Sequence, residues 1–148
     1  MDINKQPGIF VESIILTKCK YERIPFIEKE FENNIKFNLS VSISEDKKSS
    51  QVFLNCDFSL TKVNNLEEKF ATMEIEYVGV FKIDDKAENM DIERFSYSHA
   101  PGFLLPYIRQ KIHQLNMEGS LPYQIIPPIN IISLLQHQNE MHSVKYSQ

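Results

Sequence analysis

The chain has 148 residues, a length that favours one domain spanning residues 1–148, with a core that needs neither disulfides nor metal. Its content of 42% hydrophobic and 24% charged residues is ordinary for a globular protein, and no apolar run is long enough to cross a membrane. A net charge of −4 without clustered Lys and Arg argues against a nucleic-acid partner. The first residues show no basic segment followed by an apolar one, so we expect no secretory signal, no direct membrane binding and a cytoplasmic location.

Residues 9–22 are predicted to form a strand whose centre is apolar on both faces, because Ile14, Ile15 and Leu16 follow one another directly. One face of such a strand packs on the core of its own domain. The other face needs a second cover, which is either a helix of the same chain or a contact with another subunit. The sequence leaves both explanations open.

Residues 21–33 contain Pro25 and alternating charges, and are expected to form a crossing loop on the surface. Phe26 and Phe31 stand out in this polar setting. An aromatic side chain in a polar loop more often folds back on its own domain than binds a ligand, so packing is the default expectation for both.

Three further strands are predicted over residues 35–44, 51–60 and 70–83, where apolar and polar residues alternate. The second strand of the chain places five apolar residues on one face: Ile35, Phe37, Leu39, Val41 and Ile43. Gly79 interrupts the apolar row of the last strand, which indicates a bulge or a close backbone approach. The short connections favour antiparallel pairing.

A short helix is expected within residues 84–97, leading into a long helix that starts near Phe103 or Leu104 with Pro106 in its first turn. Its apolar stripe consists of Leu104, Leu105, Ile108, Ile112 and Leu115. Gly119 is predicted to end it as a left-handed C-cap, and Pro122 forbids continuation.

Asn130 is a favoured N-cap for a final helix, which carries Ile131, Leu134 and Leu135 on one side. Beyond Gln136 the chain has little to bury and is expected to fray. Residues 1–7 and about 140–148 are expected to be poorly ordered. The predicted fold class is α+β, a four-stranded antiparallel sheet on which the long helix and the shorter C-terminal helix pack.

The sequence offers no arrangement of groups suited to catalysis or metal binding. No two of its four histidines have the i, i+4 spacing that places two imidazoles on one helical face. Cys19 and Cys56 match neither a redox nor a zinc spacing, and both are expected to be free thiols. Glu74 and Glu76 lie on the outward side of a strand, where solvated charge is the default. We therefore predict a protein that is not an enzyme and has no catalytic residue, metal or cofactor.

An ordered set of residues over about thirty positions resembles the SecB family of export chaperones. The matching positions are Leu105, Pro106, Tyr107, Arg109, Gly119, Leu121, Pro122, Pro128, Ile129 and Asn130. The last predicted strand, MEIEYVGVFKI, also resembles that of the family, with a glycine before an apolar residue and Phe.

The resemblance implies an ATP-independent holdase that binds unfolded polypeptides in apolar grooves and keeps them competent for export or assembly. Carried over by position, the client groove consists of Phe31, Ile35, Phe37, Leu39, Ile131, Leu134 and Leu135. The competing interpretation is that these residues form the core between sheet and helix. The alternative function is a SecB-like chaperone dedicated to one partner, such as the antitoxin of a toxin-antitoxin pair.

The resemblance also implies a homotetramer, a dimer of dimers, with long helices between sheets. We assign its interface to Ile14, Ile15, Leu16, Tyr107, Ile108 and Ile112. In the family, an acidic sheet surface docks the basic, zinc-bearing tail of the SecA ATPase. Glu74 matches the last-strand carboxylate of that surface, but the first-strand positions are Cys19 and Arg23, which have lost negative charge. Glu76 compensates only in part, so SecA binding is expected to be weak or absent.

Overall fold

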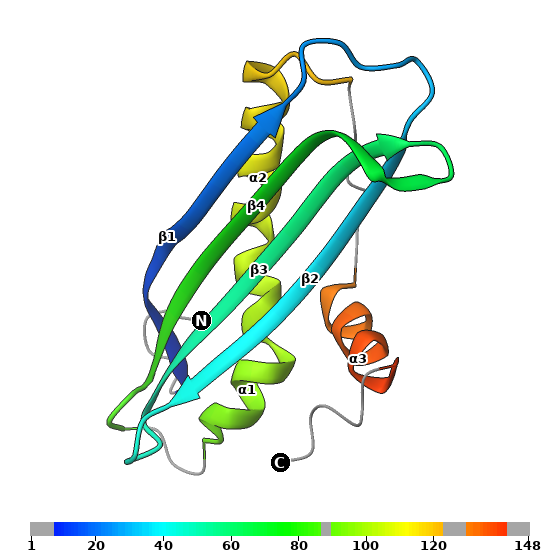
Figure 1. Cartoon of the computed structure of the whole chain (residues 1–148). Coiled ribbons are helices and arrows are strands. Elements are labelled where there is room, and N and C mark those ends of the chain that lie inside the picture. The colour runs from blue at the N-terminus through cyan, green and yellow to red at the C-terminus, as the bar shows by residue number, and fades with distance from the viewer. Residues whose placement is uncertain (1–7, 87–89, 123–129, 142–148) are drawn as a thin grey trace.

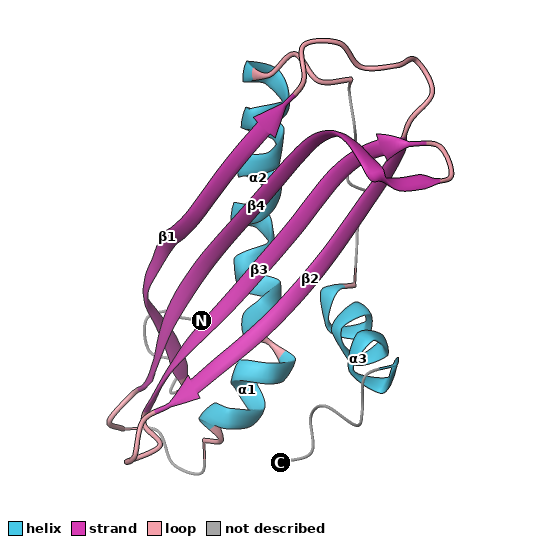
Figure 2. Ribbon diagram, in the orientation of Figure 1, coloured by secondary structure: helices cyan, strands magenta, loops and turns pink. Residues whose placement is uncertain are grey.

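The computed structural model describes residues 8–86, 90–122 and 130–141. Four antiparallel strands form one sheet in the order β1-β4-β3-β2 (Figure 1). Their bounds are Ile9–Arg23 for β1, Glu32–Ile43 for β2, Ser49–Lys62 for β3 and Asn65–Ile83 for β4. The helices lie on one face of this sheet (Figure 2), and the predicted fold class is confirmed.

The first two strands lie at opposite edges of the sheet, so the segment between them, residues 24–31, has to cross from one edge to the other (Figure 1). We call this segment the crossing loop. The sequence predicted this loop over residues 21–33. In the structure β1 extends to Arg23 and β2 begins at Glu32, so the loop is shorter. The alternation predicted for β2, β3 and β4 is confirmed, because cross-strand partners such as Phe37, Cys56 and Ile75 are all buried on the helix side.

The hairpin between β3 and β4 is longer than the sequence predicted, because β4 begins at Asn65 rather than Phe70. Asn64 adopts a left-handed backbone conformation (φ 62°), which allows a tight turn and lets Lys62 pair with Asn65. The acidic residues that follow are exposed and carry no apolar alternation, which is why this part of the strand escaped prediction.

Strand β1 is interrupted by two bulges, one at Glu12 and one at Thr17, where its register with β4 shifts. Each bulge resets the alternation of the strand. Between the bulges the alternation is regular, so Ile15 pairs with Val78 on the outer face of the sheet, while Leu16 pairs with Tyr77 on the helix side. Both faces of β1 are apolar at its centre because Ile14, Ile15 and Leu16 follow one another directly between the two bulges.

Helix α1 (Ile92–Ser98) is capped by Asp91, whose side chain accepts a hydrogen bond from the Arg94 amide at 3.1 Å. Helix α2 (Ala100–Glu118) begins earlier than expected. Pro101, not Pro106, occupies its first turn, since a proline there removes no internal hydrogen bond. Pro106 lies inside the helix, where it cannot donate to the Gly102 carbonyl one turn before it.

The C-terminal end of α2 also differs from the prediction. Gly119 is the C-cap, but its backbone is in the right-handed region (φ −85°), and the left-handed residue is Ser120 (φ 49°). A glycine is required for another reason. A β carbon at Gly119 would overlap the hydroxyl oxygen of Tyr21 and lie 2.7 Å from its Cζ.

Helix α3 (Ile131–Met141) is capped by Asn130, whose Oδ1 accepts a hydrogen bond from the Ser133 amide at 3.1 Å, as predicted. The helix continues to Met141, past Gln136, beyond which the sequence predicted that it would fray. The termini expected to be poorly ordered, and the matched positions Pro128 and Ile129, fall largely or wholly outside the described residues.

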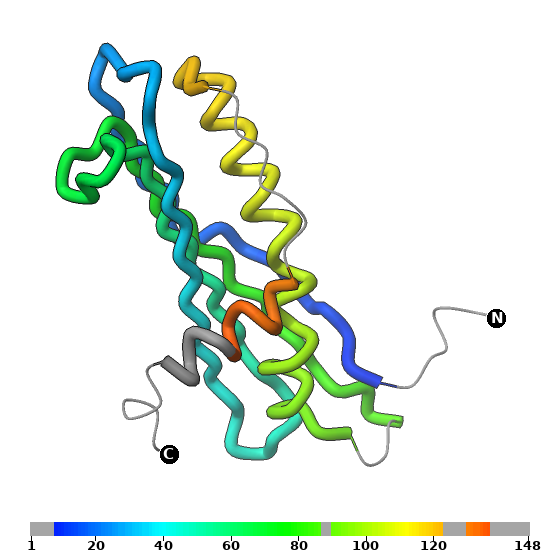
Figure 3. The backbone as a smooth tube through the Cα atoms, turned by 90° about the vertical axis from the view of Figure 1, so that its right-hand side faces the viewer, coloured from blue at the N-terminus to red at the C-terminus, as the bar shows by residue number. Residues whose placement is uncertain are grey.

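Among the described residues, one hydrophobic core lies between the sheet and the helices. Helix α2 packs mainly over β4 and β3, while α3 sits against α2 and β2 (Figure 3). Gly79 marks a close approach rather than a bulge, because a β carbon there would lie 2.7 Å from the Phe81 ring and 3.0 Å from Leu104. Helix α2 therefore rests directly on β4 at this point.

Candidate polypeptide-binding site

The residues assigned to the client groove come from three segments on the helix side of the sheet. The chain's own helix α3 fills the middle of this region, and Phe37, Ile131 and Leu135 are buried there. For these three residues the structure agrees with the competing interpretation that they are core. They cannot contact a client unless α3 moves.

The other four groove residues keep part of their surface exposed. They pack against the same core but are only partly buried: Phe31, Ile35, Leu39 and Leu134. They belong to the end of the crossing loop, to the edge strand β2 and to α3. Together they form a partly open apolar strip beside β2, which we call the β2–α3 strip.

The crossing loop contributes an apolar surface that sequence reasoning assigned to packing. Phe26 is 87% exposed, and Ile24 before it is also exposed. The expectation that Phe26 folds back onto its domain was wrong, whereas Phe31 does pack on the core. The sequence signal for this exposure was an aromatic residue directly after a proline in a charged loop.

The residues assigned to the oligomer interface divide into two groups. Ile15 is 49% exposed, Leu16 39% and Tyr107 42%, and Ile14 is partly buried. Ile108 and Ile112 are fully buried beneath the chain's own sheet and offer no surface to a second subunit. The helix therefore contributes Tyr107 to that candidate surface, with its ring centroid 5.7 Å from that of Tyr77.

The four residues assigned to export-motor docking do not form one surface. Cys19 and Arg23 pair with Ile75 and Ala71 on the helix side of the sheet, while Glu74 and Glu76 face outward. The bulge at Thr17 makes this assignment hard to reach from sequence, because it shifts which residues of β1 share a face with Glu74.

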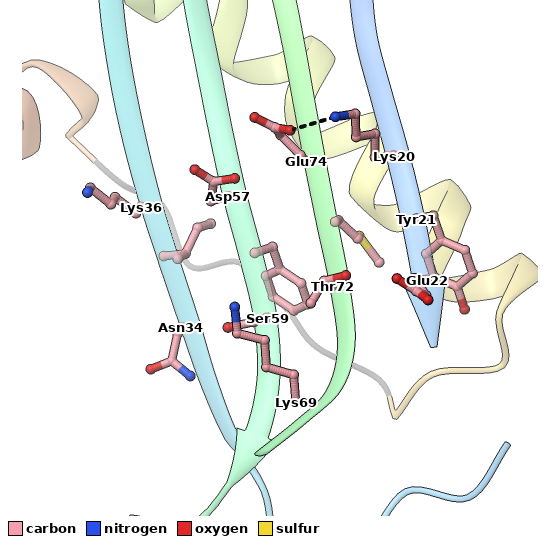
Figure 4. Close-up of a pocket in the computed structure, with 13 residues that line it drawn as sticks. Lys20, Tyr21, Glu22, Asn34, Lys36, Asp57, Ser59, Lys69, Thr72 and Glu74 are labelled. Atoms are coloured by element: carbon pink, nitrogen blue, oxygen red, sulfur yellow. Dashed lines mark ion pairs between the residues drawn. The ribbon is translucent and has the colours of Figure 1, made fainter. Parts of the chain in front are cut away.

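The neighbours of Glu74 on the outer face of β1 are basic. Its carboxylate lies 3.5 Å from the Lys18 ammonium and 3.8 Å from that of Lys20, as Figure 4 shows for Lys20. A hydrogen bond from Asn55 at 3.2 Å, aided by the two lysines, lowers the pKa of Glu74. Asp57 on the adjacent strand behaves oppositely, because partial burial and the charge of Glu74 raise its pKa.

The outer face is hollowed where the four strands twist, with a cavity of about 490 Å³ (Figure 4). Its ionisable side chains balance in sign, with three lysines and three carboxylates: Lys20, Lys36, Lys69, Glu22, Asp57 and Glu74. This face therefore has no net acidic character that would attract a basic segment.

Groups suited to chemistry are scarce among the described residues. In these ranges no three His, Cys, Asp or Glu side chains are arranged to hold a metal ion. Burial raises the pKa of the Cys56 thiol to about 12, which leaves it unreactive, and Cys19 is an exposed free thiol. Within the same ranges, no helix is both long enough and apolar enough to span a membrane.

The geometry thus defines an α+β domain with one layer of helices, whose conspicuous surface is apolar. The family model for SecB, described as preprotein translocase subunit SecB, matches residues 6–142, and the chain belongs to this family. Members of the SecB family are chaperones rather than enzymes.

The relatives include protein-export proteins SecB. That of Hahella chejuensis is 28% identical over 128 residues, covering 85% of this chain and 79% of the relative. That of Acinetobacter baumannii is 26% identical over 132 residues, covering 84% and 82%. Among solved structures, a Mycobacterium tuberculosis SecB-like chaperone in complex with an antitoxin peptide superposes with a TM-score of 0.70. It is 15% identical and covers 83% of this chain and 91% of that one, a likeness that shows the fold.

Proposed function

We propose that this protein is an ATP-independent holdase, which binds non-native polypeptides in the cytoplasm and keeps them competent for export or assembly. One observation carries the proposal: the β2–α3 strip and the crossing loop leave apolar side chains partly or fully exposed next to a complete core. A chain of this size has no structural need for such exposure, and apolar surface of this kind is typical of binding sites.

The energetics of holding favour several modest contacts over one tight pocket. Each client residue that is fixed loses about 1–2 kcal/mol of backbone conformational freedom. Full burial of one aromatic or aliphatic side chain of the client stabilises the complex by about 1.5–3 kcal/mol. A row of apolar contacts therefore holds an extended client without reading its sequence, and a competing receptor can release it without ATP.

We propose that two subunits, and then two dimers, cover the exposed apolar residues of β1 and α2. Leu16 and Tyr107 lie close together on the helix side, since Leu16 pairs with Tyr77 and the Tyr77 ring packs on that of Tyr107. Strand β1 is also an edge strand with unpaired backbone groups along one side. Both features suit a contact with a second copy, and the assembly proposed is a homotetramer.

The second candidate function is a chaperone dedicated to one partner, such as an antitoxin. Two observations favour it over general export. The outer sheet face is balanced in charge, with Lys18 and Lys20 beside Glu74, which does not suit a basic SecA tail. In addition, the SecB-like chaperone that superposes on this chain was solved with an antitoxin peptide.

The β2–α3 strip can be tested with a matched pair of variants on α3. Leu134→Asp places a charge on the partly exposed strip and is expected to weaken suppression of client aggregation. Ser133→Asp changes the exposed neighbour in the first turn of the helix, where a negative charge is favourable, and is expected to hold clients normally. Equal holding by both folded variants would place the binding site elsewhere. Testing a panel of unrelated unfolded clients against one antitoxin would separate the two candidate functions.

A further inference from the structure

The side chain of Arg23 is turned inward, onto the backbone of its own chain. Its Nε donates to the Ile24 carbonyl at 2.9 Å and its Nη2 to the Pro25 carbonyl at 3.1 Å. Its Nη1 donates to the carbonyls of Ser120, at 3.2 Å, and Gly119. A guanidinium has five N–H donors, and these four hydrogen bonds leave little of it for a partner.

The two pairs of carbonyls belong to different parts of the fold. Gly119 is the C-cap of helix α2 and Ser120 follows it, at the end where the last carbonyls have no partner within the helix and a positive charge is favourable. Ile24 and Pro25 begin the crossing loop. Arg23 therefore ties the start of this loop to the C-terminal end of α2, across the end of β1.

A second bond holds the same point of the loop to the sheet. The Ile24 amide donates to the Phe70 carbonyl of β4 at 3.0 Å. Phe26 lies two residues after Ile24, and its side chain projects into solvent. The loop thus begins from a fixed position and immediately presents an exposed aromatic side chain.

We propose that Arg23 is a positioning residue for client binding, which holds the crossing loop so that Phe26 is presented in a fixed place. This inference rests on the proposed holdase function and deepens it by naming the residue that fixes the position of the crossing loop. A loop that is ordered before binding spares the complex the cost of ordering it. Lysine can replace Arg23 only in part, because a single ammonium on a flexible stem does not reach four carbonyls in two directions.

The test compares Arg23→Ala and Arg23→Lys with Lys20→Ala, using the full-length protein and a fluorescently labelled reduced, unfolded client. Lys20 lies on the same strand but faces outward, so it controls for loss of positive charge. We expect Arg23→Ala to weaken client binding about tenfold, with Arg23→Lys in between and Lys20→Ala unchanged. Amide hydrogen exchange over residues 24–31 should quicken in the Arg23 variants only. If Arg23→Ala fails to fold, the client affinity of Arg23→Lys is compared with that of Lys20→Ala instead.

A double-mutant cycle with Phe26→Ser separates positioning from general stability. If Arg23 acts by placing Phe26, Arg23→Ala adds little further loss of affinity in the Phe26→Ser background. Fully additive losses, or unchanged client affinity despite faster exchange in the loop, overturn the proposal. If the unmodified protein binds no unfolded client, the holdase function itself fails. Hydrogen exchange then still shows whether Arg23 fixes the loop.

Discussion

The hydroxyl oxygen of Tyr21 occupies the space that a β carbon on Gly119 would need. Strand β1 and the end of α2 are therefore in direct contact, and only a glycine permits their approach. The hydroxyl is buried without a hydrogen-bond partner among the described residues, so packing rather than hydrogen bonding brings the two together.

We expect Gly119→Ala to destabilise the protein by about 1–3 kcal/mol, because the added methyl group forces Tyr21 or the end of α2 to move. Urea denaturation followed by circular dichroism measures this. Combining it with Tyr21→Phe should recover only part of the loss, since the ring Cζ would still lie 2.7 Å from the new β carbon. The same helix provides the control. Gly102→Ala meets no atom within 4 Å and should stabilise by about 0.5–1 kcal/mol.

This contact also marks a limit of reading the sequence. The position of Gly119 correctly indicated where the long helix stops, but the reason given, a left-handed cap, applies to Ser120 instead. Helix ends follow from local residues, which a sequence displays. The approach of Tyr21 is a contact between residues far apart in the chain, which no local pattern contains.

The proposed assembly predicts the effect of a charge at the exposed centre of β1. Leu16→Glu is expected to dissociate the protein into smaller species, because the side chain is half exposed in the single subunit and would become a buried charge in the contact. Light scattering coupled to size exclusion measures the mass. Ser42→Asp, on the outer face of β2, should leave the mass unchanged. If the unmodified protein has the mass of one subunit at micromolar concentration, the proposed assembly is contradicted.

The lysines beside Glu74 predict how SecA binding could be gained. The unmodified protein should bind the zinc-loaded SecA tail weakly, because Lys18 and Lys20 neutralise the charge of Glu74 and repel the basic tail. Replacing both with Glu should tighten binding by about tenfold or more at low salt, with the gain lost at high salt. Calorimetric titration decides this. Tight binding by the unmodified protein, abolished by Glu74→Ala, would show that the outer face already suffices.

The raised pKa of Asp57 predicts a pH-dependent change in stability. A carboxyl whose folded pKa lies above its unfolded value, 3.8, opposes folding at neutral pH, and that cost disappears as the pH falls below both values. Asp57→Asn should therefore raise the melting temperature at pH 7, and the gain should vanish near pH 3 (about 1 unit below the unfolded pKa).

Asp46 provides the control of opposite sign. Hydrogen bonds from the Ser44 hydroxyl at 2.6 Å and the Lys48 amide at 3.0 Å lower its pKa. Its contribution is present above the unfolded pKa and is lost as the pH falls through the folded one. Asp46→Asn should thus lower the melting temperature at pH 7, with a difference that shrinks in acid. Equal responses of the two variants would mean that neither carboxyl is perturbed as described.

The fold was more accessible from the sequence than the candidate site was. Alternation in β2, β3 and β4 and the apolar stripe of α2 are local patterns, and they gave the sheet, the helix layer and most of the core. The face of each β1 residue depends on bulges, which leave no mark in composition, so Cys19 and Arg23 were assigned to the wrong surface. Whether Phe37 lines a groove or fills a core depends on where α3 docks, which its own sequence does not determine.

The two bulges of β1 have a further consequence for how the protein behaves at high concentration. An edge strand of 15 residues with apolar centre residues is the kind of template on which chains add one after another into fibrils. The bulges divide it into short straight pieces, residues 9–11, 13–16 and 18–23. An incoming strand finds a continuous row of backbone partners within only one piece at a time. The chain can thus keep an apolar edge for one defined contact and still resist templated growth.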